Sequence, residues 1–579
     1  MSPKIKSDIP AKAHKALAVY PDFIRKILFY RNITDTDSAE VFLNPEYKPH
    51  DPFLMKGMKE AVERLLSAIK NNERVTIFSD YDADGIPGAV VMHDFFKKIG
   101  YKNFDVYIPN RHSEGFGLNE GAVREIANRG TKLIITVDCG IADAKEVKLA
   151  LSLGVETIVT DHHTPTDGIP KAFAVIDPKQ KGCEYPFKEL CGAGVAFKFV
   201  EALCFHFRSP SEIENWKLEI SATTFSIEWE KWLLDMVGIA TLSDMVPLVG
   251  ENRMFAKYGL AVLRKSPRPG LLALLLSLRI NRRTLSEDDV VFSISPRLNA
   301  ASRMGDPMDA FKLLTAQDEL EAMRLVKLLE GLNNERKGVV AGIIKEIKHV
   351  VKERNLKEKK VIVVGNPDWK PSLLGLAAGK IAEELNKPVF LWGRDSDTTF
   401  KGSCRSGGGV DILELMKKAG DIFIEYGGHS GAGGFSVLFD EIHHLEDDLE
   451  MAMDESLLIN DKSESNIADA LLSLSDLNQN TFLELDKLSP FGEGNPKPLF
   501  FIEKTIVSEV RRFGKNNVHT ALRFQKNDNE TVEAISFFTA PEDFGTPVDV
   551  GQKVSLFANI EQSFFRGRAE IRLRIKEIF

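Results

Sequence analysis

The sequence predicts an α/β protein with two α/β domains, a long helix between them and a small antiparallel β-barrel at the C-terminal end. Apolar strand-like runs alternate with helical segments from about residue 55 to 205, and the alternation restarts at about 358. Such alternation is typical of mostly parallel sheets covered by helices. From Pro490 the helix signals stop and short alternating runs follow, which favours a small barrel.

The first part of the chain gives the clearest elements. Residues 1–54 are expected to form a partly helical extension, closed by Pro45, Pro49 and Pro52. Periodicity then predicts helices over 58–70, 89–98, 120–128 and 142–153, and strands over 75–79, 104–108, 132–137, 156–160 and 172–176. Residues 55–305 are assigned to this first α/β domain.

The rest of the chain is more varied. Residues 210–235 are interpreted as an acidic, Trp-containing insert, and helical patterns cover 232–245 and 252–278. A long helical stretch over 310–353 predicts a rigid connector within 306–357. A second α/β domain is expected over 358–460, a helical bridge over 461–489 and the barrel over 490–579, with strands near 520–524, 532–538, 554–560 and 569–575.

Composition limits the class of protein. A chain of 579 residues is too long for a single core, and 43% hydrophobic with 27% charged residues is typical of a soluble protein. The longest purely apolar run found, Leu271 to Leu276, is too short to span a bilayer. The polar N-terminus does not resemble a signal peptide, and five cysteines without a CxxC pair favour a reducing compartment. We therefore expect a cytoplasmic protein.

The net charge of −9 does not exclude a nucleic-acid substrate, because local charge decides binding. Acidic helices such as 440–455 contribute to the total without touching a substrate. The stretch from Phe564 to Lys576, in contrast, has five basic residues and one acid.

Carboxylates and imidazoles follow several predicted strands. Asp80, Asp82 and Asp84 follow the first strand, Asp138 the third, and Asp161-His162-His163 the fourth, with Asp177 after the fifth. Open parallel sheets build their sites at the carboxyl ends of strands, so these residues are expected to converge. Asp244, before a Pro break, adds a further carboxylate. Like charges this close require a cation, and the mixture of ligands favours Mn²⁺ or Mg²⁺ over Ca²⁺.

Two other kinds of metal site agree less well with the sequence. The spacing Asp80-Asp82-Asp84-Gly85 resembles a calcium loop, but the twelfth position is Val91 instead of Glu and a buried strand precedes the motif. A single hydrolytic zinc fits worse, because too many carboxylates surround too few imidazoles. The set predicts two divalent cations roughly 3.5–4 Å apart, as in phosphoester cleavage.

Cationic and Gly-rich segments predict contacts with phosphate. The segments Lys401–Gly409 and Tyr426–Gly434 are interpreted as loops that expose backbone N–H groups to phosphate, with Arg405 as a bidentate donor. Further cations are Arg111, Arg297 and Arg303. In the barrel, phenylalanines are interleaved with arginines, which is typical of single-strand binding by OB folds. About half of these phenylalanines are expected in the core. The interleaved residues are Phe513, Phe524, Phe537, Phe564 and Phe565, with Arg511, Arg512, Lys515, Arg523, Arg566, Arg568, Arg572 and Arg574.

From about Val75 to the C-terminus the sequence resembles the RecJ exonucleases of the DHH phosphoesterase superfamily. The resemblance rests on ordered motifs, chiefly Asp80–Gly85, Val137–Ile141, Thr160–His163, Tyr185–Phe197, Ser243–Pro247, Pro296–Ala300 and Gly427–His429. It implies a DHH domain, a DHH-associated domain and an OB-fold barrel.

The resemblance also implies roles for individual residues. The metal ligands would be Asp82, Asp84, Asp138, His162 and Asp244, with Asp138 as the bridge. His163 would lie at the scissile phosphate and Asp80 would support the cluster. Arg111, Ser403 and Arg405 would bind the 5′-phosphate, and Gly428 and His429 would contact the nucleotide backbone.

The implied function is a single-stranded-DNA-specific 5′→3′ exonuclease that releases 5′-mononucleotides in recombination and repair. Single-strand-binding protein and a RecQ-type helicase are the expected partners, and a monomer is expected. One alternative is a DHH phosphodiesterase acting on short oligonucleotides or cyclic dinucleotides, but such relatives usually lack a C-terminal barrel. Another is a silent DNA-binding scaffold, which would have lost metal ligands that this chain keeps.

Overall fold

The protein is described here as a computed structural model of residues 4–165, 168–207, 228–396, 398–458, 467–527, 530–563 and 570–579. The chain divides into two compact units. One unit consists of Asp51–Asp244 and Ala261–Ser463, and the other of Met1–His50, Met245–Leu260 and Glu464–Phe579. Most of the acidic insert expected at 210–235 lies outside the described residues.

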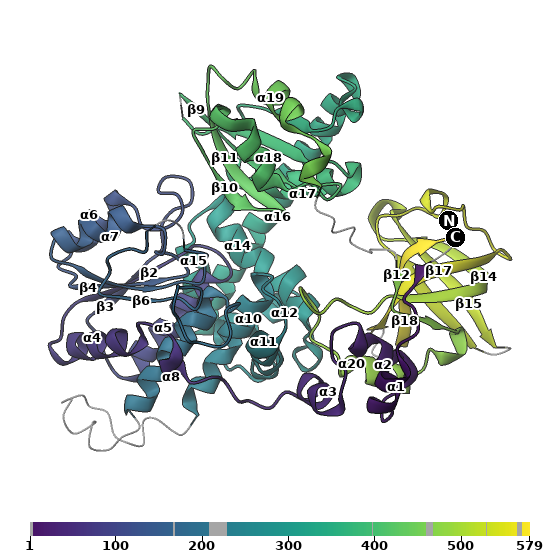
Figure 1. Ribbon diagram of the computed structural model, residues 1–579, viewed down its shortest axis with the longest axis horizontal. Helices are drawn as coiled ribbons and strands as arrows, with labels where there is room; N and C mark the ends of the chain where they lie inside the picture. The colour runs from purple at the N-terminus through teal and green to yellow at the C-terminus, as the bar shows by residue number, and fades with distance from the viewer. Residues whose placement is uncertain are drawn as a thin grey trace. The chain divides into compact units, whose positions relative to one another are not determined.

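The larger unit begins with a five-stranded parallel sheet in the order β3-β2-β4-β5-β6. Helices α6 and α7 cover one face, and α4, α5 and α8 the other (Figure 1). Every residue of β2 and β4 is buried, as expected for a sheet covered on both sides. The strands are β2 Val75–Ser79, β3 Phe104–Tyr107, β4 Leu133–Val137, β5 Glu156–Thr160 and β6 Ala174–Ile176; the helices are α4 Met58–Lys70, α5 Gly85–Lys98, α6 Glu120–Asn128, α7 Ala144–Ser152 and α8 Gly192–Phe207.

A helical region follows the sheet and ends in a long helix. It comprises α10 Leu234–Ser243, α11 Gly250–Leu263, α12 Pro269–Ser277, α13 Glu287–Asp289, a π-helical turn at Val290–Ile294, α14 Ser295–Met304, α15 Met308–Thr315 and α16 Glu319–Glu353. The predicted single helix over 310–353 is therefore two helices. Asp318 ends the interruption as the N-cap of α16, where its side chain accepts from the Glu321 N–H.

Helix α16 links two cores. Leu325 and Leu329 are buried near its start, and α14 and α12 pack against this helix. Ile343, Ile347 and Val351 near its end belong to a cluster with helix α17 Pro371–Leu385. The prediction of a connecting helix is confirmed, because α16 packs on α12 and α14 and, near its end, on α17.

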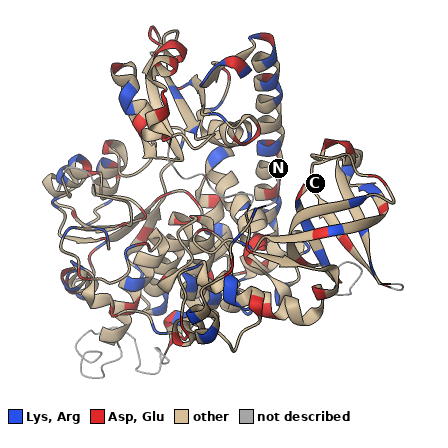
Figure 2. Cartoon of the chain, turned by 45° about the vertical axis from the view of Figure 1, so that its right-hand side comes forward, with Lys and Arg blue, Asp and Glu red and all other residues tan. Residues whose placement is uncertain are grey.

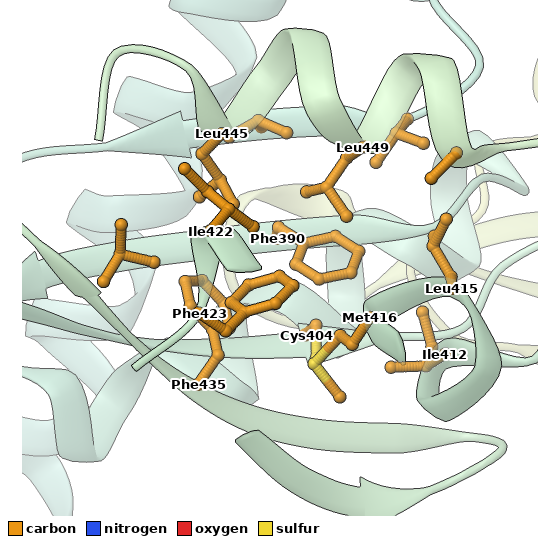
Figure 3. Close-up of a cluster of buried hydrophobic side chains, with 14 of the residues drawn as sticks. Phe390, Cys404, Ile412, Leu415, Met416, Ile422, Phe423, Phe435, Leu445 and Leu449 are labelled. Carbon is orange, nitrogen blue, oxygen red and sulfur yellow. The ribbon is translucent and has the colours of Figure 1, made fainter. Parts of the chain in front are cut away.

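The second sheet of the larger unit has the order β10-β11-β9-β8-β7. Only β7 and β8 are parallel to each other; the other neighbouring pairs are antiparallel. Helices α18 and α19 close a core around Phe390, Cys404 and Phe435 (Figure 3). The elements are β7 Ile362–Gly365, β8 Val389–Arg394, β9 Thr399–Arg405, β10 Glu425–His429, β11 Ala432–Leu438, α18 Ile412–Ala419 and α19 Leu445–Ala452.

The Gly-rich segments of this domain were predicted as loops, and most of them are strands instead. Lys401–Arg405 lies in β9, and the Tyr426–Gly434 segment forms the β10–β11 hairpin. Glycine is needed in these strands where a neighbouring side chain packs directly on the backbone. A Cβ on Gly402, for example, would lie 2.0 Å from the Phe435 ring.

The smaller unit combines N-terminal helices with a closed barrel. The N-terminal helices are α1 Ala11–Ala16, α2 Asp22–Phe29 and α3 Thr36–Leu43. Leu17, which follows α1, and residues of α2 and α3 share a core with Ala470, Leu485 and Phe500. The barrel strands are β14 Phe500–Phe513, β15 His519–Asn527, β16 Glu530–Ser536, β17 Lys553–Ser563 and β18 Glu570–Ile578. Pairing of β14 with both β15 and β17 closes the barrel in the order β14-β15-β16-β18-β17.

Three details of this unit differ from expectation. The barrel is not wholly antiparallel, because β16 and β18 run parallel. Strand β14 was missed. The predicted helical bridge over 461–489, in its described part, contains the short strands β12 Ile467–Ala468 and β13 Ala470–Leu472 as well as helix α20 Gln479–Asp486; β12 pairs with β1 Lys4–Ile5 and β13 with β14.

Among the described residues, we find no helix both long and apolar enough to cross a membrane.

Candidate metal centre

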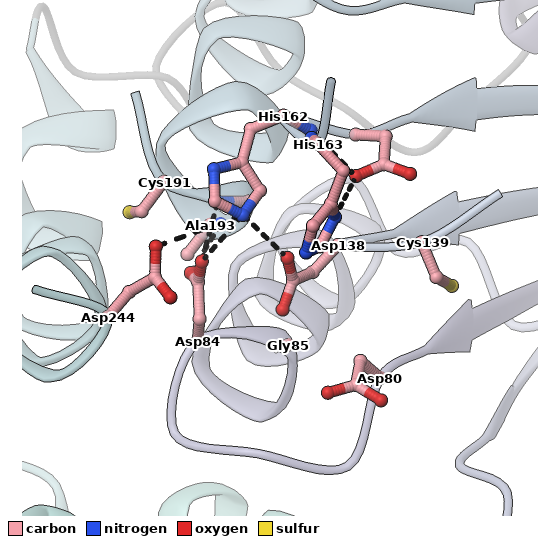
Figure 4. A network of polar contacts seen from close by, with 12 residues as sticks. Asp80, Asp84, Gly85, Asp138, Cys139, His162, His163, Cys191, Ala193 and Asp244 are labelled. Carbon is pink, nitrogen blue, oxygen red and sulfur yellow. Dashed lines mark hydrogen bonds and ion pairs between the residues drawn. The ribbon is translucent and has the colours of Figure 1, made fainter. Parts of the chain in front are cut away.

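The carboxyl ends of three neighbouring strands bring the predicted acids and histidines together. Asp80, Asp82 and Asp84 follow β2, Asp138 follows β4, and His162 and His163 follow β5. Asp244 comes from outside the sheet, at the C-terminal end of α10. Figure 4 shows the His162 ring pointing toward the carboxylates of Asp84, Asp138 and Asp244. The convergence expected from the strand ends is therefore present for these residues, whereas Asp161 after β5 and Asp177 after β6 belong to none of the groups of described residues that could hold a metal ion.

The turn between β2 and α5 is held by its own side chains. The Asp82 carboxylate accepts from the backbone N–H groups of Asp84 (2.7 Å) and Gly85 (3.1 Å). Gly85 is required because a Cβ there would lie 2.5 Å from the Asp80 carbonyl oxygen. Residue Asn299, from helix α14, accepts from the Ala83 N–H at 2.9 Å. The three aspartates are thus fixed by contacts within the turn and by one distant amide.

Asp138 lies in a left-handed backbone conformation, with φ of 61°. Its N–H donates to the Thr160 carbonyl, which ties the end of β4 to the end of β5. Gly192 passes so close that a Cβ there would be 2.4 Å from the Asp138 Cβ. Close packing and an uncommon backbone conformation together aim this carboxylate at the cluster.

The N-terminus of α8 holds Asp84. The backbone N–H groups of Gly192 and Ala193 donate to its two carboxylate oxygens at 2.6 and 2.8 Å. A helix N-terminus stabilises negative charge, so this contact fixes Asp84 in place. Asn299, Gly192 and Ala193 were not assigned a role from sequence, although all three lie in motifs that carry the resemblance.

His162 lies at the centre of the cluster. Its Nε2 is 3.2 Å from the Asp138 carboxylate and 3.8 Å from those of Asp84 and Asp244. The candidate ligands form three overlapping groups, and within each group the ligand atoms lie within 4.8 Å of one another. The groups are Asp138 with His162 and His163; Asp84 with His162 and Asp244; and Asp80 with Asp82 and Asp138. Asp138 belongs to the first and the last group, which is the arrangement required of a bridging ligand.

Asp161 organises the two histidines rather than joining the cluster. One carboxylate oxygen accepts from the backbone N–H groups of His162 and His163 and lies 2.7 Å from the His163 Nδ1. The other accepts from the Ile141 N–H at 2.9 Å. Burial alone would lower the pKa of His163, but the hydrogen bond to Asp161 and the negative charges of Asp161, Asp244 and Asp84 together outweigh it and raise this pKa to about 9. His163 is therefore protonated at neutral pH in the absence of cations.

Burial shapes the electrostatics of the acids. It raises the pKa of Asp80 and of Asp138 well above the ordinary value, and neighbouring carboxylates add to the shift. It also raises the pKa of Asp84 to about 7 and that of Asp244 to about 9, and lowers the pKa of His162 to about 3. A neutral imidazole among buried carboxylates that resist ionisation is suited to binding cations, which would reverse these shifts.

The donor set fits two divalent cations. Carboxylate oxygens predominate with one or two imidazole nitrogens, which suits Mn²⁺ and Mg²⁺ better than a thiolate-binding metal. Buried oxygens of Asp80 and Asp138 have no hydrogen-bond partner within the described structure, so they are available as ligands.

Two of the predicted arginines lie near the metal cluster. The Arg111 guanidinium lies over the Tyr81 ring, 5.0 Å from the ring centroid. Its positive charge favours the ionised form of Asp80 and so acts to lower the pKa of that carboxyl, against the effect of burial. Burial and the charges of Arg111 and Arg336 lower the pKa of Arg303 to about 9. Arg303 also donates to the Ser372 carbonyl at the start of α17. Arg297 differs, since its guanidinium is paired with Glu330 at 3.0 Å and with the Ser293 carbonyl at 3.1 Å.

The remaining predicted residues lie on the second sheet. Strand register places Arg405, Ala432 and His429 in one row across β9, β11 and β10, and Ser403, Gly434 and Gly427 in the next row on the same face. A Cβ on Gly375 of α17 would lie 2.6 Å from the Arg405 guanidinium, so this glycine makes room for it. Gly428 alternates to the other face, so its side of the strand differs from that of His429.

One exposed aromatic residue next to the centre was not predicted from the sequence. Phe116 is 53% exposed, and its ring lies edge-to-face with His163 at 5.7 Å and with Tyr81 at 6.5 Å. A loop phenylalanine gives no sequence signal of this kind, because only the fold brings it beside His163.

The fold and this centre define a metal-dependent phosphoesterase of the DHH class. The chain matches the models of the DHH family N-terminal domain over residues 74–224, the DHHA1 domain over 358–454 and the RecJ OB domain over 468–577.

Named relatives narrow the class further. The chain is 34% identical to the single-stranded-DNA-specific exonuclease RecJ of Bacillus subtilis, covering 96% of this chain and 67% of that one. It is 31% identical to the RecJ of Escherichia coli, covering 77% and 78%. Crystal structures of Thermus thermophilus RecJ with Mn²⁺ and with Mg²⁺ match at TM-scores of 0.78 and 0.72, with 26% and 25% identity. They cover 100% and 99% of this chain, and 79% and 78% of the other. The chain belongs to the RecJ family.

Proposed function

We propose that this protein is a single-stranded-DNA-specific exonuclease that works from the 5′ end and releases 5′-mononucleotides. The observation that carries the proposal is the overlap of three ligand groups around Asp138 and His162. The RecJ relatives are named as exonucleases specific for single-stranded DNA, and two of their structures contain Mn²⁺ or Mg²⁺.

In the metal centre, Asp82, Asp84, Asp138, His162 and Asp244 would hold two divalent cations, with Asp138 shared. When bound, such a pair lowers the pKa of a water molecule and neutralises charge on the phosphoryl group. Asp80 supports the cluster from the end of β2. His163, oriented by Asp161 and exposed over 47% of its side chain, is placed to donate a hydrogen bond or a proton to the scissile phosphate.

The 5′-phosphate would bind to Arg405 and Ser403, with Arg111 as a further cation. Burial lowers the pKa of Arg405, and its known hydrogen bond goes to a backbone carbonyl, so part of its guanidinium fork is available for phosphate. His429, in the same cross-strand row, would contact the nucleotide backbone beyond that phosphate. Gly428 and Arg297 would support substrate binding without contacting the substrate. Gly428 shapes the β10–β11 hairpin, and Arg297 is paired with Glu330.

Phe116 would stack on a nucleobase of the terminal nucleotides. A base on the exposed face of Phe116 would keep the backbone near His163, because the Phe116 ring lies edge-to-face with the His163 ring. Stacking on an aromatic face tolerates every base, which suits an enzyme without sequence preference.

The barrel would bind the single strand through contacts of its own. Phe513, His519, Phe537 and Phe538 form one aromatic cluster with ring centroids 4.7–5.9 Å apart. The Arg574 guanidinium lies 4.0 Å from the Phe537 ring and that of Arg511 lies 5.8 Å from the Phe513 ring. Phe524 is buried in the barrel core, and Phe564, Phe565, Arg566 and Arg568 lie outside the described residues.

Several finer assignments belong to the same proposal. The domain limits are 1–54 for the N-terminal extension, 55–305 for the DHH domain and 306–357 for the connecting helix. The DHH-associated domain spans 358–460, the bridge 461–489 and the OB-fold barrel 490–579. The role is in recombination and repair, with single-strand-binding protein and a RecQ-type helicase as partners, and the protein acts as a cytoplasmic monomer.

The test compares 5′-phosphorylated single strands with blunt duplexes of the same sequence. With Mn²⁺ or Mg²⁺ we expect mononucleotide products from the single strand and little product from the duplex, and no product with EDTA. Arg405→Ala should reduce the preference for 5′-phosphate over 5′-hydroxyl by about tenfold or more, as expected on losing a charge-assisted hydrogen bond. Equal digestion of duplex, or products released with EDTA, would contradict the proposal.

A further inference from the structure

A second pocket lies at the outer edge of the catalytic-domain sheet and shares no residue with the metal centre. It has a volume of about 480 Å³ and is lined by the C-terminal half of α5, the turn after it, strand β3 and helix α15. This volume is in the range that holds a bulky side chain or a small ligand. Nothing in the proposed reaction uses it.

The floor of this pocket is aromatic. The His93 ring lies edge-to-face with Phe104 at 5.7 Å and with Phe311 at 5.4 Å. The His93 Nδ1 lies 2.9 Å from the Asp94 carboxylate, which fixes the orientation of the ring. The floor is thus a preformed apolar surface that favours a large apolar group.

The rim of the pocket is positively charged. Lys97, Lys102 and Lys312 are exposed around it. Within the described ranges no ion pair is found for Lys97 or Lys102, and Lys312 is 4.0 Å from the nearest carboxylate, that of Asp309. The one acid that lines the pocket, Asp105, is occupied by Arg74 at 2.7 Å and by the Thr76 hydroxyl at 2.6 Å. A ligand here would therefore be acidic.

One wall of the pocket is an unpaired strand edge. β3 is the outermost strand of its sheet and, among the described strands, pairs with β2 alone. Helix α15, which packs against α5, forms the opposite wall. A groove between an edge strand and a helix accepts an extended peptide that adds to the sheet through main-chain hydrogen bonds.

We propose that this groove is the docking site of an acidic peptide segment of a partner protein, which pairs with β3 and places one bulky apolar side chain over His93. The rim lysines select for acidic residues and the aromatic floor for the apolar side chain. A nucleotide would satisfy the lysines and the rings but would leave the edge of β3 unused, so the peptide accounts for more of the observations.

The test uses a labelled ten-residue peptide of alternating Glu and Val with one central Phe. Fluorescence anisotropy should detect binding to the full-length protein, and the double variant Lys97→Glu with Lys312→Glu should bind at least about tenfold more weakly. Lys145→Glu, on the exposed side of α7, is the matched control and should bind like the wild type. Activity on single-stranded DNA should stay within about twofold in all three proteins, since none of these lysines belongs to the metal centre.

Hydrogen exchange locates the binding site. On peptide binding the amides of residues 104–107 should exchange more slowly, because strand addition pairs the free edge of β3. No binding, equal binding by the charge-reversal variant, or binding without protection at 104–107 would overturn the proposal. So would tight binding of deoxyadenosine monophosphate that displaces the peptide.

Discussion

Asp138 combines a left-handed backbone with nearly complete burial, and both properties bear on its replacement. Asn tolerates this backbone region better than most residues, whereas Ala would add strain. We expect Asp138→Asn to lower the rate of hydrolysis by more than about 100-fold, beyond the loss typical of groups that only support a ligand. Its stability without metal should equal or exceed that of the wild type, because a buried carboxyl among like charges is removed.

Asp177→Asn is the matched control for that variant. Asp177 is also a buried acid at the end of a neighbouring strand, β6, but it belongs to none of the three ligand groups. Steady-state rates with saturating Mn²⁺ should stay within severalfold of the wild type for Asp177→Asn. Near-normal turnover by Asp138→Asn would refute the shared-ligand assignment.

Asp244 makes stability depend on pH. Its pKa is raised from 3.8 to about 9, so between these values the folded carboxyl keeps a proton that the unfolded chain has lost. The free energy of unfolding therefore decreases as pH rises from about 4 through about 9. In EDTA, the Tm of the wild type should fall between pH 6 and 9 by about 3 °C more than that of Asp244→Asn, which has no such group. Parallel Tm curves for the two proteins would contradict this.

At the level of residues, the sequence predicted the candidate metal ligands but not the residues that hold them in place. The aspartates and histidines could be predicted because they end consecutive strands of a parallel sheet, where position along the chain determines proximity. Asn299 contacts Ala83 across 216 residues, and Gly192 contacts Asp84 across 108. Such contacts depend on tertiary packing, which a single sequence does not reveal.

Three helices of the catalytic domain are joined through Arg268, at the start of α12. Its guanidinium lies 2.7 Å from Asp94 on α5 and 2.8 Å from Asp235 on α10, and all three groups are largely buried. Arg268→Met would leave two carboxylates without their cation, so we expect it to lower the free energy of unfolding by about 3–5 kcal/mol. Urea unfolding followed by circular dichroism measures this change.

Arg124→Met provides the comparison for Arg268→Met. Arg124 forms an exposed pair with Glu120 on α6, so its loss should change stability by less than about 1 kcal/mol. Similar losses in both variants would mean that burial of the Arg268 network contributes nothing.

Phe538 tests the role of the barrel. It is 83% exposed with a φ of 58°, and its ring lies 4.7 Å from that of His519. Phe538→Ala should weaken binding of a long single strand by about 1–3 kcal/mol, or roughly 5- to 150-fold, with little effect on hydrolysis of a very short oligonucleotide. Ile506→Ala, also exposed on the barrel at 53%, should leave both unchanged. Equal losses on long and short strands would instead indicate a structural role for Phe538.

At the level of elements, the periodic segments were predictable and the irregular ones were not. Helices 58–70 and 120–128 and strands 75–79 and 156–160 agree with the structure to the residue. The β10–β11 hairpin was missed because glycines usually indicate loops, and the parallel β16–β18 pair because pairing direction is not encoded locally.

For the molecule as a whole, the net charge of −9 is a poor guide to its substrate. Acidic and basic residues are interspersed over most elements (Figure 2), and many acids are buried at the metal centre. We propose that the cations that contact the substrate are few and local: Arg111 near Asp80, Arg405 on the second sheet and Arg574 on the barrel. Substrate capture should therefore weaken steeply as salt increases, despite the negative total.

The direction of digestion tests the central claim most directly. A single strand carrying a 5′-phosphate, labelled in its first and its last nucleotide with different isotopes, is incubated with Mn²⁺ and sampled before completion. We predict that the first-nucleotide label appears at once as a mononucleotide while the last-nucleotide label remains on progressively shorter strands. Early release of the label from the 3′ end, or release of both labels in internal fragments, would contradict a metal-dependent exonuclease that works from the 5′ end.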